Sequence, residues 1–308
     1  MTPIRNRRDA RRTALPLLAL LLAVMPSLYG QSNRLFYTVP YTYYTDVSGA
    51  FAKEYSVGGG AYTYVGIGRH SVEFDAAYSR IHWAEQTLTD PVFGPYTLAA
   101  LDFDQVDLTS IYTNYQITNI QFRIGGHAIF SNDAFTDGTL TALAGLKRVR
   151  PNEYSAAVDV YQTFYSNYAP EFSALQVDGT FGFYFGNAFT YGQLYAETRG
   201  SYIRLSEPVG FEETQFPSIQ QTLRFSRNGV ALEAFWWGGY RAFAVDNGGT
   251  VVFNLPERHL GAFGASMWWG FHERASLKVA WRQGRFKELG GEAVATGNTV
   301  SLTGGWTW

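Results

Sequence analysis

The residues best suited to chemistry in this chain lie on one predicted β-strand and its neighbour. His127 and Arg123 are four residues apart, so in an extended strand their side chains point to the same face. A hydrolase would need such a histidine as a base near a nucleophile and an orienting acid, and Ser131 and Asp107 are the nearest candidates by pattern. Nothing resembles a hydrolase nucleophile elbow, and one histidine on a polar strand face is usually a hydrogen-bonded lining residue. The pattern therefore predicts that the protein is not an enzyme.

Other sequence features argue against metal, phosphate and thiol chemistry. The triplet Gly58-Gly59-Gly60 lies within a predicted strand, so we expect it to relieve crowding and bend the sheet rather than to bind phosphate. The chain has no cysteine, which excludes disulfides, thiolate metal sites, cysteine nucleophiles and a lipoprotein anchor. We therefore expect no cofactor and no metal. The other histidines fall at predicted strand ends or turns without the spacing of metal ligands: His70, His82, His259 and His272.

The composition favours a barrel that crosses a membrane. The chain contains 23 Phe, 21 Tyr and 8 Trp, against 16% charged residues. A soluble domain could hide so many aromatic side chains only in a deep core, whereas a membrane barrel carries them on its outer surface. After residue 30 no apolar run approaches the ~18–20 residues that a membrane helix needs. A closed β-barrel is the other structure that satisfies its backbone in lipid.

Alternation of apolar and polar residues predicts an all-β chain of about fourteen antiparallel strands in an up-and-down barrel, with twelve to sixteen as the range. A soluble two-sheet sandwich or periplasmic barrel is the alternative. The expected strands span residues 35–47, 55–67, 71–82, 104–116, 120–131, 138–147, 154–165, 172–185, 189–204, 218–226, 230–245, 260–271 and 275–282, with a last strand ending at 308.

The predicted connections alternate in length. Those after the third, ninth, eleventh and thirteenth strands are long, and they include residues 85–100 and 246–258. Those after the second, fourth, eighth, tenth and twelfth strands are short. Outer-membrane barrels have short periplasmic turns and longer external loops, so this rhythm places both chain ends on the periplasmic side.

Both ends of the sequence look like targeting signals. Five arginines within residues 5–12 precede an uncharged stretch from Thr13 to Gly30, which is typical of a secretory signal peptide. An uncleaved anchor helix is the alternative. The last nine residues, 300–308, alternate in period two and end on Trp306, Thr307 and Trp308. This tail resembles the carboxy-terminal strand signal of bacterial outer-membrane β-barrel proteins, with Trp306 and Trp308 as its aromatic assembly residues.

The resemblance identifies a porin-like class and no specific family. It implies a signal peptide over residues 1–30 and an outer-membrane barrel over residues 31–308, in a Gram-negative bacterium with both termini in the periplasm. The implied partners are outer-membrane lipid, the barrel-assembly machinery and periplasmic chaperones. Without residues 1–30, which carry five of the 24 Lys and Arg and one of the 26 Asp and Glu, 19 cations and 25 anions remain. The resulting charge of −6 argues against a nucleic-acid partner.

Apolar faces fix which side of each strand meets lipid, because a one-residue slip would turn every polar group outward. The predicted lipid-facing residues are Val106, Leu108, Ile120, Phe122, Ile124, Phe181, Phe183, Phe185, Val230, Leu232, Leu277, Val279 and Trp281. The predicted lumen-lining residues are Glu73, Asp75, Asp107, Arg123, His127, Asp159, Asp178, Arg199, Arg224, Arg241, Lys278 and Arg282. Acidic residues dominate the earlier strands and basic residues the later ones, although Arg123, Glu197 and Glu233 break that order.

The charged lumen has two interpretations. Unpaired charges are tolerated if water fills the lumen, but in a plugged lumen the same charges would pair as structural ion bridges. Inward aromatic residues have two interpretations as well, either as a track for sugars or aromatic solutes or as bulk that narrows the barrel. These aromatic residues are Tyr62, Tyr64, Trp83, Tyr161, Tyr184, Tyr195, Phe235, Trp237 and Trp268.

The resulting functional expectation is a porin-like channel for small hydrophilic solutes. The alternative is a non-conducting structural or partner-binding barrel, such as the anchor of a secretion or surface complex. A barrel enzyme is the third hypothesis, with His127 as its test residue.

Overall fold

The computed structural model describes residues 34–90, 94–168, 170–187, 190–289 and 293–308. The fold described below is that of the compact unit Leu35–Trp308. The predicted signal peptide, residues 1–30, lies outside the described residues. Over the part of the chain that is described, no helix is both long and apolar enough to cross a membrane.

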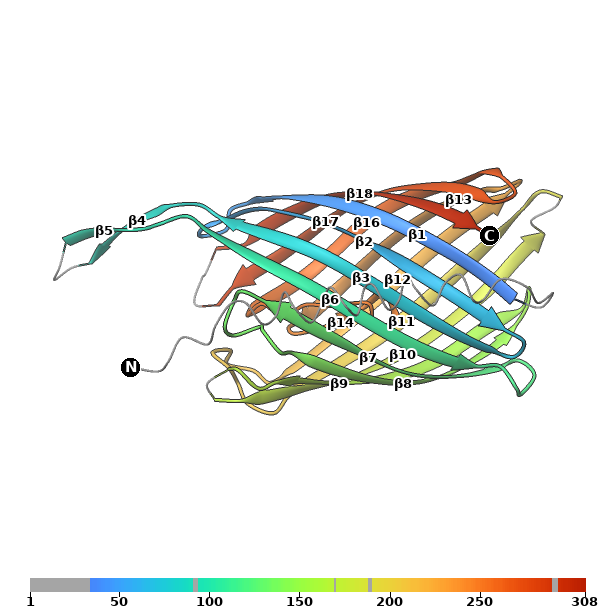
Figure 1. Cartoon of the computed structure of the whole chain (residues 1–308), viewed down its shortest axis with the longest axis horizontal. Helices are drawn as coiled ribbons and strands as arrows, with labels where there is room; N and C mark the ends of the chain where they lie inside the picture. The colour runs from blue at the N-terminus through green and yellow to red at the C-terminus, as the bar shows by residue number, and fades with distance from the viewer. Residues whose placement is uncertain (1–33, 91–93, 169, 188–189, 290–292) are drawn as a thin grey trace. The chain divides into compact units, whose positions relative to one another are not determined.

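Fourteen antiparallel strands close into one barrel (Figure 1), which confirms the predicted fold class and strand number. Each strand pairs with its neighbours in chain order, and β1 returns to pair with β18. The strands are β1 (Arg34–Ser48), β2 (Lys53–Ile67), β3 (His70–Trp83), β6 (Leu101–Asn114), β7 (Ile120–Ser131), β8 (Leu140–Arg150), β9 (Tyr154–Tyr165), β10 (Phe172–Asn187), β11 (Gly192–Leu205), β12 (Gln215–Arg227), β13 (Val230–Arg241), β16 (Glu257–His272), β17 (Ala275–Glu288) and β18 (Ala295–Thr307).

The two ends of the barrel differ in the length of their connections. Turns after β2, β6, β8, β10, β12 and β16 have at most five residues, and the connections at the opposite end are longer except for residues 49–52 between β1 and β2. We call the two ends the short-turn end and the long-loop end. Left-handed residues close several of the short turns, among them Asn119 (φ 63°), Asn152 (φ 62°) and Asn228 (φ 48°), a conformation that asparagine tolerates. The backbone N–H of Trp308 donates to the carbonyl of Phe36 at 3.0 Å, so β1 starts and β18 finishes at the short-turn end.

Three predicted segments differ from the structure by more than the shift of up to three residues found at other strand ends. The predicted strand 230–245 leaves the sheet after Arg241, because Phe243 adopts φ 52° and turns the chain into the lumen. The predicted loop 85–100 contains a two-stranded hairpin, β4 (Gln86–Asp90) and β5 (Gly94–Leu98), that extends from the long-loop end (Figure 1). The predicted strand 275–282 continues to Glu288, because its last residues still pair with β18.

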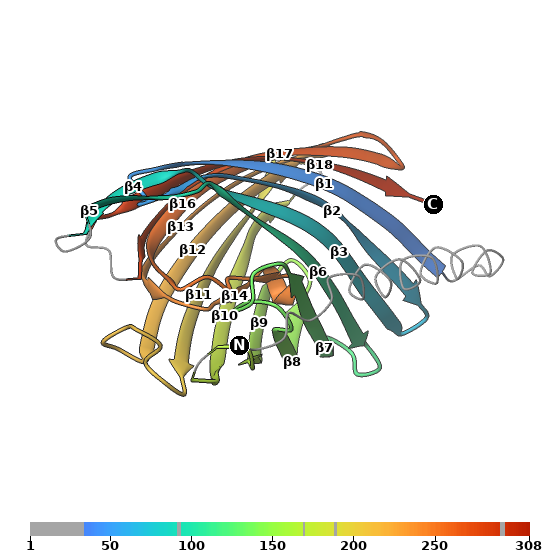
Figure 2. The ribbon, with the colours of Figure 1, turned by 60° about the vertical axis from the view of Figure 1, so that its left-hand side comes forward.

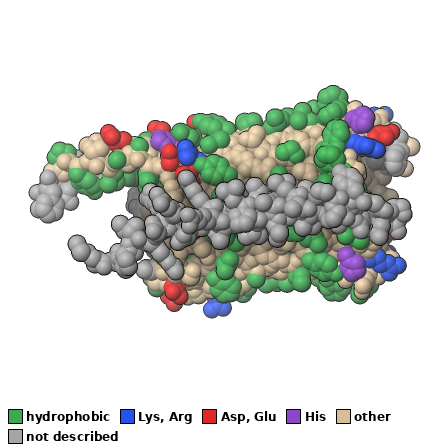
Figure 3. Space-filling view, in the orientation of Figure 1, with side chains coloured by type: hydrophobic (Ala, Val, Ile, Leu, Met, Phe, Trp, Pro, Cys, Tyr) green, Lys and Arg blue, Asp and Glu red, His purple; other side chains and the backbone are tan. Residues whose placement is uncertain are grey.

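The outer wall is apolar between its two ends. Figure 3 shows charged and histidine side chains gathered near the ends of the barrel, with hydrophobic side chains on the wall between them. Phe181, Phe183 and Phe185 are 45%, 45% and 54% exposed, whereas the intervening inward faces of β10 are covered. The predicted outward residues that the structure leaves exposed are Phe122, Ile124, Phe181, Phe183, Phe185, Leu232, Leu277, Val279 and Trp281. This register is the one that the apolar alternation predicts.

Candidate functional site: the lumen of the barrel

The connection between β13 and β16 folds into the barrel. We call residues 242–256 the lumen loop; it contains β14 (Val245–Asp246), a 3-10 turn (Asn247–Gly249) and β15 (Val251–Val252). Figure 2 shows this segment inside the ring of strands. The lumen loop divides the interior into two parts. The filled half lies between the loop and β7–β13, and the cavity half lies between the loop and β1, β2, β3, β6 and β16–β18.

A hydrophobic cluster anchors the start of the lumen loop in the filled half. Ala242, Phe243 and Ala244 are at most 1% exposed and pack against residues of β9–β12. The ring of Phe243 lies 4.8 Å from that of Phe172, which stacks on Tyr165 at 4.5 Å. Burial of large side chains such as these contributes roughly 1.5–3 kcal/mol each, so this end of the loop is part of the folded core.

A second cluster holds the middle of the loop. Val245 and Val252 pack with Ile111, Ile129, Leu143 and Tyr161. At Gly249 (φ 107°) a Cβ atom would lie 2.7 Å from Cδ1 of Leu143. Only glycine combines this backbone conformation with so close an approach.

The side-chain amide of Gln176 on β10 forms two hydrogen bonds with the backbone of one lumen-loop residue, as a neighbouring strand would. Its Nε2 donates to the carbonyl of Val245 at 2.7 Å, and its Oε1 accepts from the N–H of Val245 at 2.8 Å. Both backbone groups of a buried residue are thereby satisfied, and orphaned buried groups are costly. The contact fixes the height of the loop in the barrel.

Ion pairs complete the filled half. Asp246 of the lumen loop lies 2.7 Å from Nη1 of Arg199 and 3.6 Å from Nη1 of Arg241, and Arg199 also lies 2.8 Å from Asp178. Burial by itself would raise the pKa of the Asp246 carboxyl, but Arg199, Arg241 and Arg282 outweigh it and hold that pKa below its usual range.

Arg123 forms a parallel contact in the filled half. It lies 3.4 Å from Asp159 and donates to the carbonyl of Gly248 at 3.0 Å. Of the predicted lumen-lining residues, Arg123, Asp159, Asp178, Arg199 and Arg241 therefore pair with carboxylates or with the lumen loop. In this half the predicted acidic and basic walls meet and neutralise each other.

The cavity half contains a space of about 840 Å³. Its wall is formed by β1, β2, β3, β6, β7, β16, β17 and β18, and the lumen loop forms its inner side. The predicted lumen-lining residues that face this space are Glu73, Asp75, Asp107, Arg123, Lys278 and Arg282. Two tyrosines of β1, Tyr41 and Tyr43, also line it; they went unassigned in the sequence because the alternation of β1 shows two faces without indicating which one is internal.

The acidic side of the cavity is held by neutral donors. Glu73 accepts from the hydroxyl of Tyr62 at 2.7 Å, and Asp75 accepts from the hydroxyl of Tyr41 at 3.1 Å. Asp107 accepts from Gln105 at 2.8 Å. Among the described residues, no lysine or arginine lies within 4 Å of these three carboxylates, and all three line the cavity.

The basic side of the cavity lies on β17. The side chain of Lys278 is 40% exposed, and its ammonium group comes no closer than 4.0 Å to the carboxylate of Glu233, so the ion pair is weak. The guanidinium of Arg282 lies 5.8 Å from the ring centre of Phe253, and no described residue accepts a hydrogen bond from it. Higher in the same space, toward the long-loop end, Lys53 pairs with Glu257 at 2.8 Å.

Tyrosines of β1 lie flat over glycines of β2. A Cβ atom at Gly58 would lie 2.6 Å from Cζ of Tyr43, and one at Gly60 would lie 2.8 Å from the hydroxyl of Tyr41. The glycines therefore make room for rings along the wall. This arrangement agrees with the role in relieving crowding that the sequence predicts for the triplet, and it leaves the cavity open beside the rings.

The predicted hydrolase constellation is not assembled. His127 is 3% exposed; its Nδ1 lies 2.8 Å from the hydroxyl of Thr109 and its Nε2 lies 3.1 Å from Asp107. Ser131 instead donates to the carbonyl of Asp104 at 3.1 Å and accepts from the N–H of Asp133. His127 and Asp107 do meet, as the pattern suggests, but Ser131 belongs to the long-loop end. No group of three or more possible metal ligands occurs among the described residues.

The remaining predicted residues lie away from the cavity. Arg224 faces inward opposite Glu233 and Tyr195 and is exposed. Trp306 and Trp308 are exposed on the outer wall at the short-turn end. The sequence did not single out Asp246, because the apolar residues before it, 242–245, continue the alternation of the preceding predicted strand.

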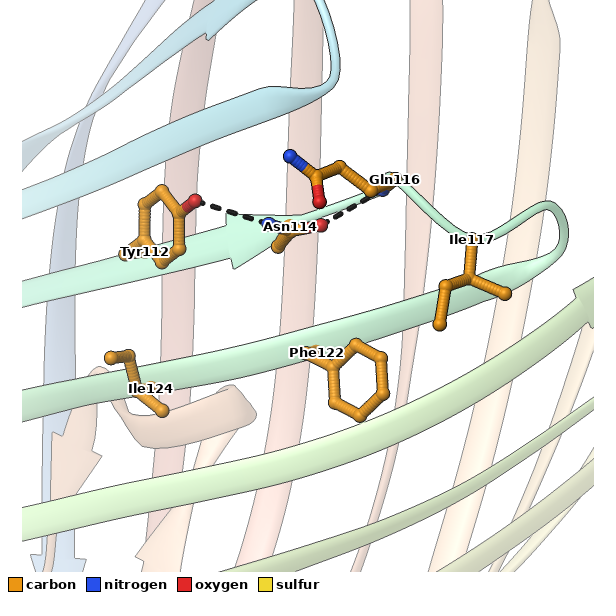
Figure 4. Close-up of a pocket in the computed structure, with 6 residues that line it drawn as sticks. All are labelled: Tyr112, Asn114, Gln116, Ile117, Phe122 and Ile124. Atoms are coloured by element: carbon orange, nitrogen blue, oxygen red, sulfur yellow. Dashed lines mark hydrogen bonds between the residues drawn. The ribbon is translucent and has the colours of Figure 1, made fainter.

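A separate crevice of about 310 Å³ lies on the outer wall at the short-turn end, between β6 and β7 (Figure 4). Its lower side is apolar, with Ile117, Phe122 and Ile124, and its upper side carries Tyr112 and the two amides Asn114 and Gln116. The side chain of Asn114 donates to the hydroxyl of Tyr112 and accepts from the N–H of Gln116. The crevice opens outward, so it is not part of the lumen.

No family model matches the chain, and no curated protein matches it. Solved structures do. The Pseudomonas putida toluene transporter TodX has a TM-score of 0.50 and 9% identity over 91% of this chain and 90% of that chain. A bacterial polysaccharide outer membrane secretin has a TM-score of 0.52 and 10% identity over 88% of this chain and 98% of that chain. Acinetobacter baumannii OccAB1 is 10% identical, with a TM-score of 0.40 over 90% of this chain and 97% of that chain.

Sequence identities of 9–10% support the same fold, but they do not indicate which solute this chain binds or transports. The TodX and secretin matches span about nine-tenths of this chain, and their descriptions are of a toluene transporter and of an outer membrane secretin. The closed fourteen-stranded sheet and its apolar outer wall agree with them. The chain therefore has the fold of the outer-membrane β-barrel class, and no narrower family is identified.

Proposed function

We propose that the protein is a porin-like channel through which small hydrophilic solutes cross the outer membrane. One observation carries the proposal: a space of about 840 Å³ lies beside the lumen loop and is lined by charged and hydroxyl groups. Carboxylates without ion-pair partners, and an ammonium group with only a weak one, are costly in a dry interior. Glu73, Asp75 and Lys278 therefore favour water in the cavity half.

The charges of the cavity half also create an electric field across the width of the proposed pathway. Glu73, Asp75 and Asp107 lie on β3 and β6, whereas Lys278 and Arg282 lie on β17. Rings of charge set ion preference in selective pores, and exposed charges are screened over about 8–10 Å at ordinary salt. We expect the field to act on solutes only where the lumen loop narrows the passage.

The orientation and the partners belong to the same proposal. The short-turn end would face the periplasm, residues 1–30 would direct export, and Trp306 and Trp308 would be read by the barrel-assembly machinery after delivery by periplasmic chaperones. Support comes from the alternation of short and long connections and from the exposed position of both tryptophans at the short-turn end.

Conductance in a planar bilayer tests the channel, and two neighbouring alanines provide a matched pair. Ala77 lines the cavity, whereas the side chain of the preceding Ala76 lies on the opposite, outer face of β3. We expect Ala77→Trp to lower the single-channel conductance by about half or more, because an indole would occupy the narrow space. Ala76→Trp should leave it unchanged, since aromatic side chains suit the lipid face. Absence of current in the wild-type protein would reject the proposal.

The second candidate is a non-conducting barrel that binds a partner. The filled half and the hairpin of β4 and β5 favour it, because an isolated two-stranded hairpin is marginally stable in water. Tyr96 and Leu98 are exposed on this hairpin. A wild-type barrel that is folded and inserted but carries no current would support this candidate over the channel.

A further inference from the structure

We infer that Arg282 binds the carboxylate of a small solute whose body is a ring stacked beside Phe253. The inference deepens the proposed channel function by naming a solute class, and it rests on that function only for passage of the solute. Binding itself is measurable whether or not the barrel conducts.

Arg282 differs from the other arginines of the lumen. Arg199 and Arg241 share Asp246, and Arg123 pairs with Asp159. No described residue accepts a hydrogen bond from Arg282 or forms an ion pair with it. A guanidinium carries five N–H donors, and a cation away from bulk water is costly without an acceptor. The cavity therefore holds a strong donor group that has no hydrogen-bond acceptor among the described residues.

The surroundings of Arg282 lack a free negative charge. Asp246 acts on Arg282 electrostatically, but its carboxylate forms ion pairs with two other arginines, and Glu257 is bound by Lys53 at 2.8 Å. Lys278 stands four residues away on the same face of β17 and adds a second, weakly paired cation. An anion entering the cavity would meet two cations on one wall.

Aromatic rings beside Arg282 indicate the rest of the ligand. The guanidinium carbon lies 5.8 Å from the ring centre of Phe253, and that ring lies 4.9 Å from His259. Phe286 follows at 5.8 Å from His259. A guanidinium near a ring leaves its N–H edges available for a planar, bidentate acceptor, and a carboxylate has that geometry. A flat body attached to the carboxylate could stack on the same rings.

The opposite wall orients the ligand. Glu73, Asp75 and Asp107 face the cavity from β3 and β6 and would repel a carboxylate from that side. They would attract an amine instead. An acid, an alcohol and an amine built on one ring therefore distinguish binding at Arg282 from binding at the acidic wall and from stacking alone.

The test is isothermal titration calorimetry on the folded full-length barrel in detergent, with benzoate, benzyl alcohol and benzylamine as probes. We expect benzoate to bind at least about tenfold more tightly than benzyl alcohol, as one charge-assisted hydrogen-bonded pair supplies. Arg282→Gln should abolish that difference, and Arg282→Lys should restore part of it. Arg285→Gln is the matched control, because Arg285 is exposed on the other face of β17.

Three results would overturn the inference: benzoate binding no tighter than benzyl alcohol, benzoate binding unchanged in Arg282→Gln, or benzylamine binding tightest of the three. A heat-modifiable shift on electrophoresis checks that each variant is folded. If the wild-type barrel carries no current but Arg282-dependent benzoate binding is found, the channel proposal fails and the binding site stands.

Discussion

The two halves of this lumen are built from the same residue types and use them in opposite ways. In the filled half Arg199, Arg241 and Asp178 form ion pairs through or beside Asp246, and hydrophobic clusters hold the lumen loop against the wall. In the cavity half Glu73 and Lys278 lack close ionic partners and border open space. The difference shows that a charged inward face does not by itself indicate a wet pore; one inserted carboxylate changes what the face does.

Removing that carboxylate should have the largest effect. Asp246→Ala leaves Arg199 and Arg241 without their shared partner, and breaking a buried pair costs about 3–5 kcal/mol. We expect the loop to detach from the filled half, with higher and noisier single-channel conductance and a shift toward anions. Glu207→Ala, an exposed change in another long loop, should alter none of these. Unchanged current in Asp246→Ala would show that the ion pairs do not hold the loop.

On the outer surface, a charged substitution should destabilise the barrel equally beside the filled half and beside the cavity half. Phe183 lies on the outer wall of a strand that borders the filled half, and Leu302 lies on the outer wall of a strand that borders the cavity half. Both side chains are exposed on the predicted lipid face. Arginine at either position should destabilise the barrel by about 2–4 kcal/mol, measured by reversible unfolding in vesicles. A cost at only one of them would mean that the lipid-facing register of the other strand is wrong.

Paired and unpaired carboxylates should differ in their contribution to stability. Asp178→Asn weakens contacts to Arg199 and Gln176 in a site that is 2% exposed, so we expect a cost of about 1–3 kcal/mol. Glu73→Gln retains an acceptor for Tyr62 beside the cavity and should cost less than about 1 kcal/mol. Equal losses in the same unfolding assay would remove the distinction between the halves.

Acid should not release the lumen loop through Asp246. Because the pKa of this carboxyl is lowered in the folded protein, its stabilising effect is complete above the unfolded value of about 3.9 and is lost only as the pH falls through the lower folded value. The difference in conductance between wild type and Asp246→Ala should therefore be the same at pH 8 and pH 5. A difference that shrinks at pH 5 would mean that Asp246 already takes up a proton there.

The smallest expected effect concerns the glycines under the tyrosines. Gly58→Ala would push the ring of Tyr43 toward the cavity, whereas a Cβ at Gly179 meets nothing within 4 Å. We expect a cost of about 1 kcal/mol and a modest fall in conductance for Gly58→Ala, and neither for Gly179→Ala. The same fall in both variants would indicate a general backbone effect.

The fold was predictable because period-two patterning is local. The outward positions of Phe122 and Val279 follow from alternation within one strand, and the fourteen-strand count follows from turn residues such as Asn228 and Gly229. The inward faces of Asp178 and Arg282 follow in the same way. Local patterning does not reveal which strands meet across the lumen.

The lumen loop shows where that limit lies. Its position depends on contacts with Gln176, Leu143 and Arg199, which are more than forty residues from the loop in sequence. The apolar residues 242–245 extend the alternation of β13, so the pattern predicts strand there, and only the backbone turn at Phe243 sends them inside. Local sequence patterns therefore could not predict whether the lumen is filled or contains water.

The division of the lumen can be tested most directly with single cysteines, since the chain has none. Ser301 lines the cavity, whereas Ser201 is 5% exposed beside Asp178 in the filled half. A small water-soluble methanethiosulfonate should label Ser301→Cys readily and Ser201→Cys more than about tenfold more slowly, because the second site is reached only after local opening. Equal labelling rates in the folded, membrane-inserted barrel would contradict the account.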